Sequence, residues 1–176
     1  MEQARRRSAT AMLALAVFAV PLGLAVPASA SPVTGCRFTE SSVGVQVAGD
    51  VGTWHVGRAL QIWNGVHAGQ PHLYLTTRPT APVKVRRYWS SGTAVDAWTS
   101  YRCGDQQPTT ATIYVNAARR LSDASRATVS VHELGHALGL GHRPLAVQRS
   151  VMFPRLWGMT DYPTRLDRRT LASVYS

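Results

Sequence analysis

The chain contains, at residues 132–142, the sequence His132-Glu133-Leu134-Gly135-His136-Ala137-Leu138-Gly139-Leu140-Gly141-His142. Residues four apart lie on the same face of an α-helix, so His132 and His136 can direct two imidazole nitrogens to one cation. Gly139 can adopt a backbone conformation closed to other residues, which lets the chain leave the helix and bring His142 round as a third ligand. Three protein ligands leave a fourth position open, and this is typical of a catalytic rather than a structural zinc site.

Glu133 lies beside the expected metal ligands and supplies a carboxylate that a purely structural metal site does not require. A zinc ion with an open position lowers the pKa of a coordinated water, and a nearby carboxylate can take the proton as that water attacks a carbonyl. No separate side-chain nucleophile is then needed. The stretch indicates a hydrolase with one catalytic Zn²⁺, held by His132, His136 and His142, and with Glu133 as the general base.

The patterns on either side predict an α+β fold. Alternating or β-branched runs predict strands around 43–47, 72–77, 83–88 and 109–116, and a loop through Gly92. Apolar residues recur at helical spacing over 54–66, with Asp50 or Thr53 as the expected cap. The helix with the histidines is expected to begin at Ser122 or Asp123. Its apolar stripe, which we expect to pack on the sheet, consists of Ala127, Val131, Leu134 and Leu138.

The first thirty residues have the layout of a secretory signal peptide. Three arginines (Arg5–Arg7) precede an apolar run from Ala11 to Val26, and Ala28-Ser29-Ala30 has the small-x-small form of a cleavage site. A membrane anchor is the alternative, but about sixteen residues interrupted by proline and glycine are short for a bilayer span. We therefore expect a secreted protein, cleaved after about Ala30 and without stable membrane insertion.

The rest of the chain, residues 31–176, has the length of one compact domain. Removal of the first thirty residues takes away three arginines and one glutamate, so the formal charge falls from +10 to +8. A basic extracellular protein can adhere to anionic cell-wall polymer. The positive charges are scattered, and no basic run interleaved with aromatic residues indicates nucleic-acid binding. We expect a monomer.

Cys36 and Cys103 are the two cysteines of the chain, and both lie in the exported part. An oxidising compartment makes a disulfide between them the expected state. Closing a loop of this length stabilises a fold by roughly 4 kcal/mol in the chain-entropy model.

Every fixed position of the 132–142 stretch matches the zinc signature of the metzincins, HExxHxxGxxH, which the chain therefore resembles. The sequence Ser150-Val151-Met152-Phe153-Pro154 is similar to the Met-turn, the tight turn that places a methionine beneath the metal. A methionine followed by an aromatic residue and proline is most similar to the matrixins. The strand ending at Asn116 and a terminal helix with Asp167 and Tyr175 are similar to small bacterial matrixin-like proteases.

The resemblance implies a metzincin-like α+β fold. We expect a twisted mixed sheet packed on two long helices, and a small C-terminal subdomain with the Met-turn, in which Met152 has a supporting role, and a terminal helix. It also implies a metalloendopeptidase whose protein or peptide substrate lies extended along the edge of the sheet. Residues 154–157 are then expected to line the pocket for the side chain just beyond the cleaved bond.

The chain departs from several relatives of this kind. Snapalysin-type proteases carry Asp as the third ligand where this chain has His142, and astacins and serralysins have Tyr at the place of Pro154. The His- and Asp-rich loop that carries structural zinc and calcium in vertebrate matrixins is not found. The remaining histidines, His55, His67 and His72, are expected to be ordinary structural residues.

Three alternatives stay open at this stage. The chain can be a basic extracellular binding protein that keeps zinc for structure, although Glu133 has no role there. It can also be a zinc amidase that acts on cell-wall peptide. Finally, Arg102-Cys103-Gly104, followed by Asp105, faintly resembles the cysteine latch of matrix metalloprotease propeptides, although it lies inside the expected catalytic domain.

Overall fold

A computed structural model describes residues 33–104, 107–147 and 149–176 of the chain. The expected signal peptide lies outside these described residues. The elements in chain order are β1 (Ser42–Val47), η1 (Gly49–Trp54), α1 (Val56–Asn64), β2 (His72–Thr76), β3 (Val83–Tyr88), β4 (Ala97–Gly104), β5 (Gln107–Asn116), α2 (Asp123–Ala137), η2 (Leu156–Gly158) and α3 (Arg165–Tyr175). The mixture of strands and helices confirms the α+β class.

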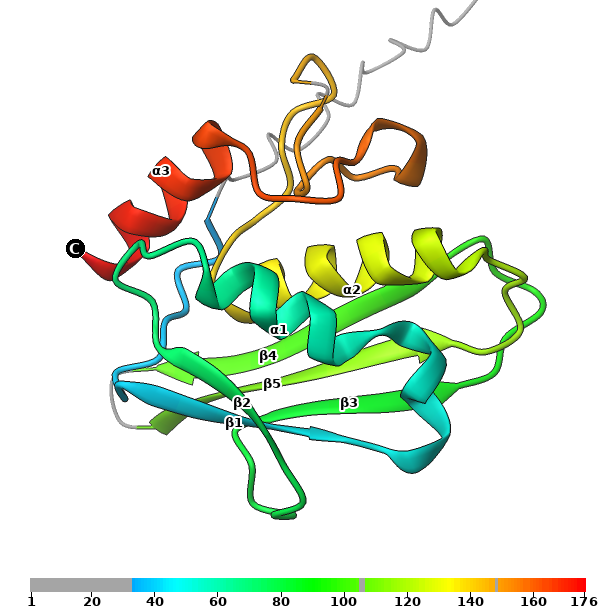
Figure 1. Ribbon diagram of the computed structural model, residues 1–176, viewed down its shortest axis with the longest axis horizontal. Helices are drawn as coiled ribbons and strands as arrows, with labels where there is room; N and C mark the ends of the chain where they lie inside the picture. The colour runs from blue at the N-terminus through cyan, green and yellow to red at the C-terminus, as the bar shows by residue number, and fades with distance from the viewer. Residues whose placement is uncertain (1–32, 105–106, 148) are drawn as a thin grey trace, which may run out of the picture.

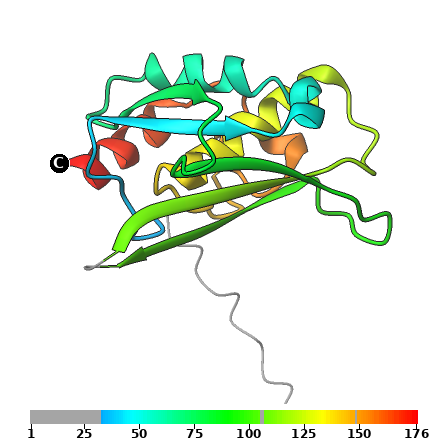
Figure 2. The same cartoon turned by 90° about the horizontal axis from the view of Figure 1, so that it is seen from below.

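The five strands form one mixed sheet with the order β2-β1-β3-β5-β4. The strands β2, β1, β3 and β5 pair in parallel, whereas β4 pairs antiparallel with β5 and forms one edge. The helices α1 and α2 cover one face of the sheet, and α3 lies beyond the end of α2 (Figure 1). Seen from below, the opposite face of the sheet is not covered by any helix of the described residues (Figure 2).

Four of the strands match the sequence prediction, and β4 does not. The predicted loop through Gly92 is present, but the sequence analysis assigned no strand to residues 97–104, which pair with β5 over seven positions. As an edge strand, β4 has mostly exposed or half-buried side chains. It therefore lacks the alternation of apolar residues from which strands are predicted.

The helix α1 covers nine residues, which makes it shorter than α2 with fifteen. Neither Asp50 nor Thr53 caps it, because a 3₁₀ segment, η1, intervenes and His55 precedes α1 with a φ of 53°. For α2 the expected cap is present: the Ser122 hydroxyl accepts a hydrogen bond from the backbone N–H of Ser125.

Helix α2 is largely buried in the core from Ala127 onward, whereas its first turn is more exposed. Its predicted apolar stripe is buried against the sheet, and two polar contacts fix its position against the preceding segments. The Trp63 indole donates to the carbonyl of Val131 at 2.8 Å, and the Ser130 hydroxyl donates to the carbonyl of Trp54 at 2.6 Å. The nine consecutive residues 127–135 are all buried, so this part of the helix gives its histidines a rigid base.

The segment before β1 closes over the end of α2. Cys36 and Cys103 form a disulfide, with 5.6 Å between their Cα atoms, so this segment is tied to β4. The disulfide leaves no thiolate for a latch at Cys103. Among the residues that the structure describes, no helix has the length and apolarity needed to cross a membrane.

Replacing both cysteines by serine should lower the free energy of unfolding by about 2–4 kcal/mol, because the unfolded chain regains the entropy of an open loop. Denaturant unfolding of the oxidised proteins measures the difference. As a control, reduction should bring the wild type close to the double variant and leave that variant unchanged. Equal stability of oxidised wild type and variant would contradict the prediction.

Candidate metal centre and active-site cleft

The end of α2 shows how the chain brings its third histidine back to the helix. After Leu138 the backbone turns at Gly139, whose φ is +97°. The N–H of Leu140 bonds to the carbonyl of Gly135, and that of Gly139 to the carbonyl of His136, which is the hydrogen-bond pattern of a Schellman motif. A side chain at Gly139 would also collide with the carbonyl of Cys36. Glycine is therefore required here both for the left-handed turn and for the close approach.

The turn brings three imidazole rings together. The Nε2 atoms of His132, His136 and His142 lie 3.0, 3.1 and 3.2 Å from one another. The Nδ1–H of His132 donates to the carbonyl of Val151 at 2.6 Å, and that of His136 donates to the carbonyl of Leu140 at 2.8 Å. Because Nδ1 carries the proton in these two rings, their Nε2 atoms present lone pairs.

Lone pairs that face one another at this distance repel, unless a cation lies between them. Ligands about 2.05 Å from a tetrahedral zinc ion are separated from each other by about 3.3 Å, close to the distances found here. The three imidazoles thus fit a zinc ion with an open fourth position. In the described part of the chain, these histidines form the one group of three or more ligand-type residues whose atoms are close enough for a metal.

Burial keeps the three imidazoles unprotonated. It lowers the pKa of His132 well below the usual range, with repulsion from His136 as the next cause. It also lowers the pKa of His136 to about 4 and, less strongly, that of His142. Since a metal binds only the unprotonated ring, the nitrogens are available at neutral pH.

The carboxylate of Glu133 lies in the wall of the same site and is 4% exposed. Burial raises its pKa to about 7, against the lowering effect of a hydrogen bond from Thr99. The Thr99 hydroxyl is 2.6 Å from Oε2 of Glu133. A carboxyl group whose pKa is close to neutral can both accept and return a proton, as a general base and acid must.

A tight turn at Ser150–Phe153 packs against α2, with Met152 next to Gly135. The N–H of Phe153 bonds to the carbonyl of Ser150 at 3.1 Å, and Met152 is completely buried. A side chain added at Gly135 would lie 2.5 Å from the sulfur of Met152 and 2.9 Å from Trp63. Gly135 is therefore needed for close packing, which lets the methionine reach the helix between the two histidines.

A cleft runs past the three histidines and Glu133. One side is formed by β4, including Trp98 and Thr99, and the other by the segment after the turn. That segment contributes all of residues 154–157 to the lining of the cleft. Apolar side chains dominate the surroundings: Tyr101, Val129, Leu156 and Met159.

The comparison with known families agrees with this architecture. The family model described as matrixin, Peptidase_M10, matches residues 54–175, which is more than half of the chain. The chain belongs to the matrixin family. A comparison with curated proteins finds no match. Membership supports a zinc metallopeptidase, and the matched range includes the three histidines, Glu133 and Met152.

The structure of this matrixin places the predicted site residues together and adds three that were missed. His55, His67 and His72 lie outside the three-histidine group. Thr99 was missed because β4 was not predicted. Arg143 and Ser150 were not singled out as site residues. Their positions could have indicated a role, because Arg143 directly follows His142 and Ser150 directly precedes Val151 in the turn. Asp167 was noted only through the resemblance.

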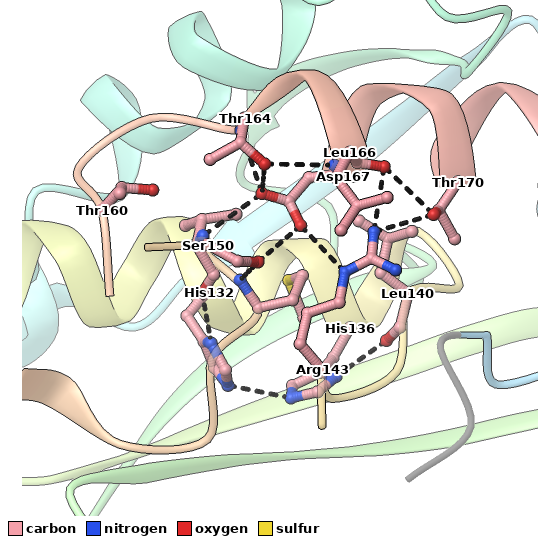
Figure 3. A network of polar contacts seen from close by, with 12 residues as sticks. His132, His136, Leu140, Arg143, Ser150, Thr160, Thr164, Leu166, Asp167 and Thr170 are labelled. Carbon is pink, nitrogen blue, oxygen red and sulfur yellow. Dashed lines mark hydrogen bonds and ion pairs between the residues drawn. The ribbon is translucent and has the colours of Figure 1, made fainter. Parts of the chain in front are cut away.

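A network of polar contacts joins Arg143, Ser150 and Asp167 (Figure 3). Asp167, on α3, is completely buried. Its Oδ1 accepts from the Ser150 hydroxyl at 2.6 Å and from Arg143 at 3.3 Å, and its Oδ2 accepts from the N–H of Val151 at 3.3 Å. The same Oδ2 accepts from the N–H and the hydroxyl of Thr164, which completes a capping box at the start of α3. One carboxylate thus joins α3, the turn and the chain after His142.

Arg143 is buried as well, at 5% exposure, and forms an ion pair with Asp167. Its guanidinium also donates to the carbonyl of Leu166 at 3.0 Å and to the Thr170 hydroxyl at 2.7 Å. Its backbone N–H donates to the carbonyl of Met152 at 2.9 Å. Arg143 therefore ties the residue next to the third histidine to both the turn and α3.

Asp167→Asn should lower the free energy of unfolding by about 3–5 kcal/mol, because the amide leaves donors unpaired and a buried guanidinium without its counter-charge. Asp50→Asn is the matched control, since Asp50 forms an exposed ion pair with Arg87 and should cost less than about 1 kcal/mol. Chemical denaturation gives both values. Similar losses in the two variants would rule out the special role of the buried pair.

Proposed function

We propose that this matrixin is a secreted zinc-dependent metalloendopeptidase. One observation carries the proposal: three imidazole Nε2 atoms lie within 3.2 Å of one another beside a buried carboxylate at the floor of an open cleft. His132, His136 and His142 would hold one Zn²⁺, and Glu133 would act as the general base. Met152, in a Met-turn, would support the site from below by packing.

Zinc supplies Lewis acidity, which brings the pKa of a water molecule towards neutrality and polarises the carbonyl that the water attacks. Glu133 then accepts the proton of the attacking water as the new C–O bond forms. When the C–N bond of the peptide breaks, the same carboxyl group gives this proton to the leaving amine. The reaction consumes one water and yields a carboxylate and a protonated amine, which carries both protons of the water, with Glu133 restored.

The substrate in this proposal is a peptide in extended conformation that pairs with β4. This strand is an edge of the sheet, so one side of its backbone has no strand partner in the described part of the chain, and it lines the cleft next to Glu133. Main-chain hydrogen bonds to such an edge bind a peptide largely independently of its sequence. The apolar lining of the cleft, with Leu156 and Met159, would favour an apolar side chain just beyond the cleaved bond.

Secretion is part of the proposal, supported by the disulfide, since disulfides persist in oxidising compartments. The first thirty residues would be the signal peptide, and residues 31–176 one catalytic domain. The enzyme would act as a monomer, without nucleic-acid partners. Its positive charge would allow adhesion to anionic cell-wall polymer.

Two rival functions predict different results. A zinc-stabilised binding protein would not hydrolyse peptides, and its zinc would only affect stability. A zinc amidase would cleave cell-wall peptide but not casein. The buried carboxylate of Glu133 disfavours the first rival. Burial of a carboxylate costs free energy, and a zinc site that only stabilises the fold has no use for this group.

Removal of the metal tests the cofactor. We expect 1,10-phenanthroline to abolish the hydrolysis of casein, and added Zn²⁺ to restore it. Mg²⁺ or Ca²⁺ should not restore it, because these hard cations prefer oxygen ligands to three imidazoles. A protease that keeps its activity after its metal content has fallen to zero by elemental analysis would contradict a catalytic zinc.

Glu133→Gln tests the general base. The amide preserves the size of the side chain but cannot take a proton from water, so kcat should fall by about 10²–10⁴-fold while zinc content stays at one ion per chain. Glu40→Gln, at an exposed position, is the control and should keep wild-type kinetics. Wild-type activity in the Glu133 variant would refute the mechanism.

A further inference from the structure

The carboxylate of Glu133 has one hydrogen-bond partner among the described residues, the hydroxyl of Thr99. The distance from Thr99 Oγ1 to Glu133 Oε2 is 2.6 Å. The distance from Thr99 Oγ1 to the backbone carbonyl oxygen of Glu133 is longer, at 3.2 Å. A hydroxyl has one proton to donate, and the shorter contact to a charged acceptor is the stronger one. The other carboxylate oxygen, Oε1, has no hydrogen bond with any described residue.

Thr99 is well placed to hold this oxygen still. Its backbone lies in the ladder between β4 and β5, opposite Ile113, so it cannot shift without disturbing the sheet. Its β-branched side chain has few rotamers, and it faces α2. The neighbouring Trp98 points to the opposite face of the sheet, where it stacks on Tyr114 with 4.3 Å between the ring centroids. The Glu133 side chain, in contrast, has three rotatable bonds and needs an external contact to fix it.

We propose that Thr99 is a positioning residue for the hydrolysis, and this inference rests on the proposed function. By donating to Oε2, the Thr99 hydroxyl fixes the carboxylate so that Oε1 is the oxygen that takes the proton from the attacking water. The role proposed for the Thr99 side chain is an indirect one. The side chain acts through Glu133, and it links the strand that would bind the substrate to the base that would act on it.

A merely structural role for Thr99 has a different signature. If the contact only ties β4 to α2, its loss will lower stability and weaken substrate binding through the displaced edge strand. KM will then rise while kcat changes little. If the contact positions the base, kcat will fall and KM will stay, because the peptide still pairs with an intact edge.

The experiment compares Thr99→Val, which keeps the shape and removes the hydroxyl, with Thr99→Ser, which keeps the hydroxyl. Thr112→Val is the matched control, since Thr112 is paired with Ser100 in the β4–β5 ladder, and Ser100 is next to Thr99 and so on the other face. The zinc-loaded full chain is assayed with a fluorogenic peptide for kcat and KM. Zinc content and the thermal unfolding midpoint are measured for each variant.

We expect Thr99→Val to lower kcat about 10- to 100-fold, with KM within about twofold of wild type and zinc content unchanged, since small misplacements of a catalytic group have effects of this size. Thr99→Ser should stay within about threefold of wild type, and Thr112→Val should not differ from it.

The role of Thr99 is overturned if Thr99→Val keeps its kcat, if the valine and serine variants lose kcat equally, or if the loss is confined to KM or zinc content. Failure of the proposed function is distinguishable from these outcomes. It appears instead as a wild-type protein that does not cleave peptides, or as full activity of Glu133→Gln.

Discussion

Three imidazole lone pairs directed at one point are the constraint on which the rest of this structure depends. Without a cation they repel, and the helix alone supplies only two of them, His132 and His136. The scaffold must therefore supply rigidity against this repulsion. It does so by fixing the Nδ1 side of two rings on backbone carbonyls, those of Val151 and Leu140. Each of these carbonyls belongs to a segment that is itself fixed by other contacts.

The segments that carry the Val151 and Leu140 carbonyls are themselves held in place by contacts with other parts of the chain. The turn that carries Val151 is held from α3 by Asp167, and the segment that carries Leu140 is bridged to the chain before β1 at Val33. The disulfide extends this bridge to β4, the strand that faces Glu133. The three histidines and Glu133 are thus positioned by α3 and by the segment before β1 as much as by the sheet. Apolar packing holds the sheet and the helices together, whereas these directional contacts determine the orientation of the histidine rings.

Prediction from the sequence succeeded where one local pattern determines one local structure. The spacing of His132, His136 and His142, with Gly139 between them, leaves few ways to build a helix and a return. It failed for β4, because an edge strand half exposed to solvent needs no apolar alternation. It also failed for Thr99 and Arg143, since their roles arise from partners 34 and 24 residues away. Such partners can be found only once the topology has brought the segments together.

The buried pair of Arg143 and Asp167 illustrates what a polar network contributes that apolar packing does not. Two apolar side chains of similar volume can be as stabilising, because charges lose their hydration on burial. Apolar contacts, however, have no preferred direction. The Asp167 carboxylate accepts from Ser150, Val151 and Thr164 as well as from Arg143, and each bond fixes an orientation. The turn can therefore hold the Val151 carbonyl against His132 in one geometry. In this matrixin the ion pair is part of the network that orients the His132 ring through the Val151 carbonyl.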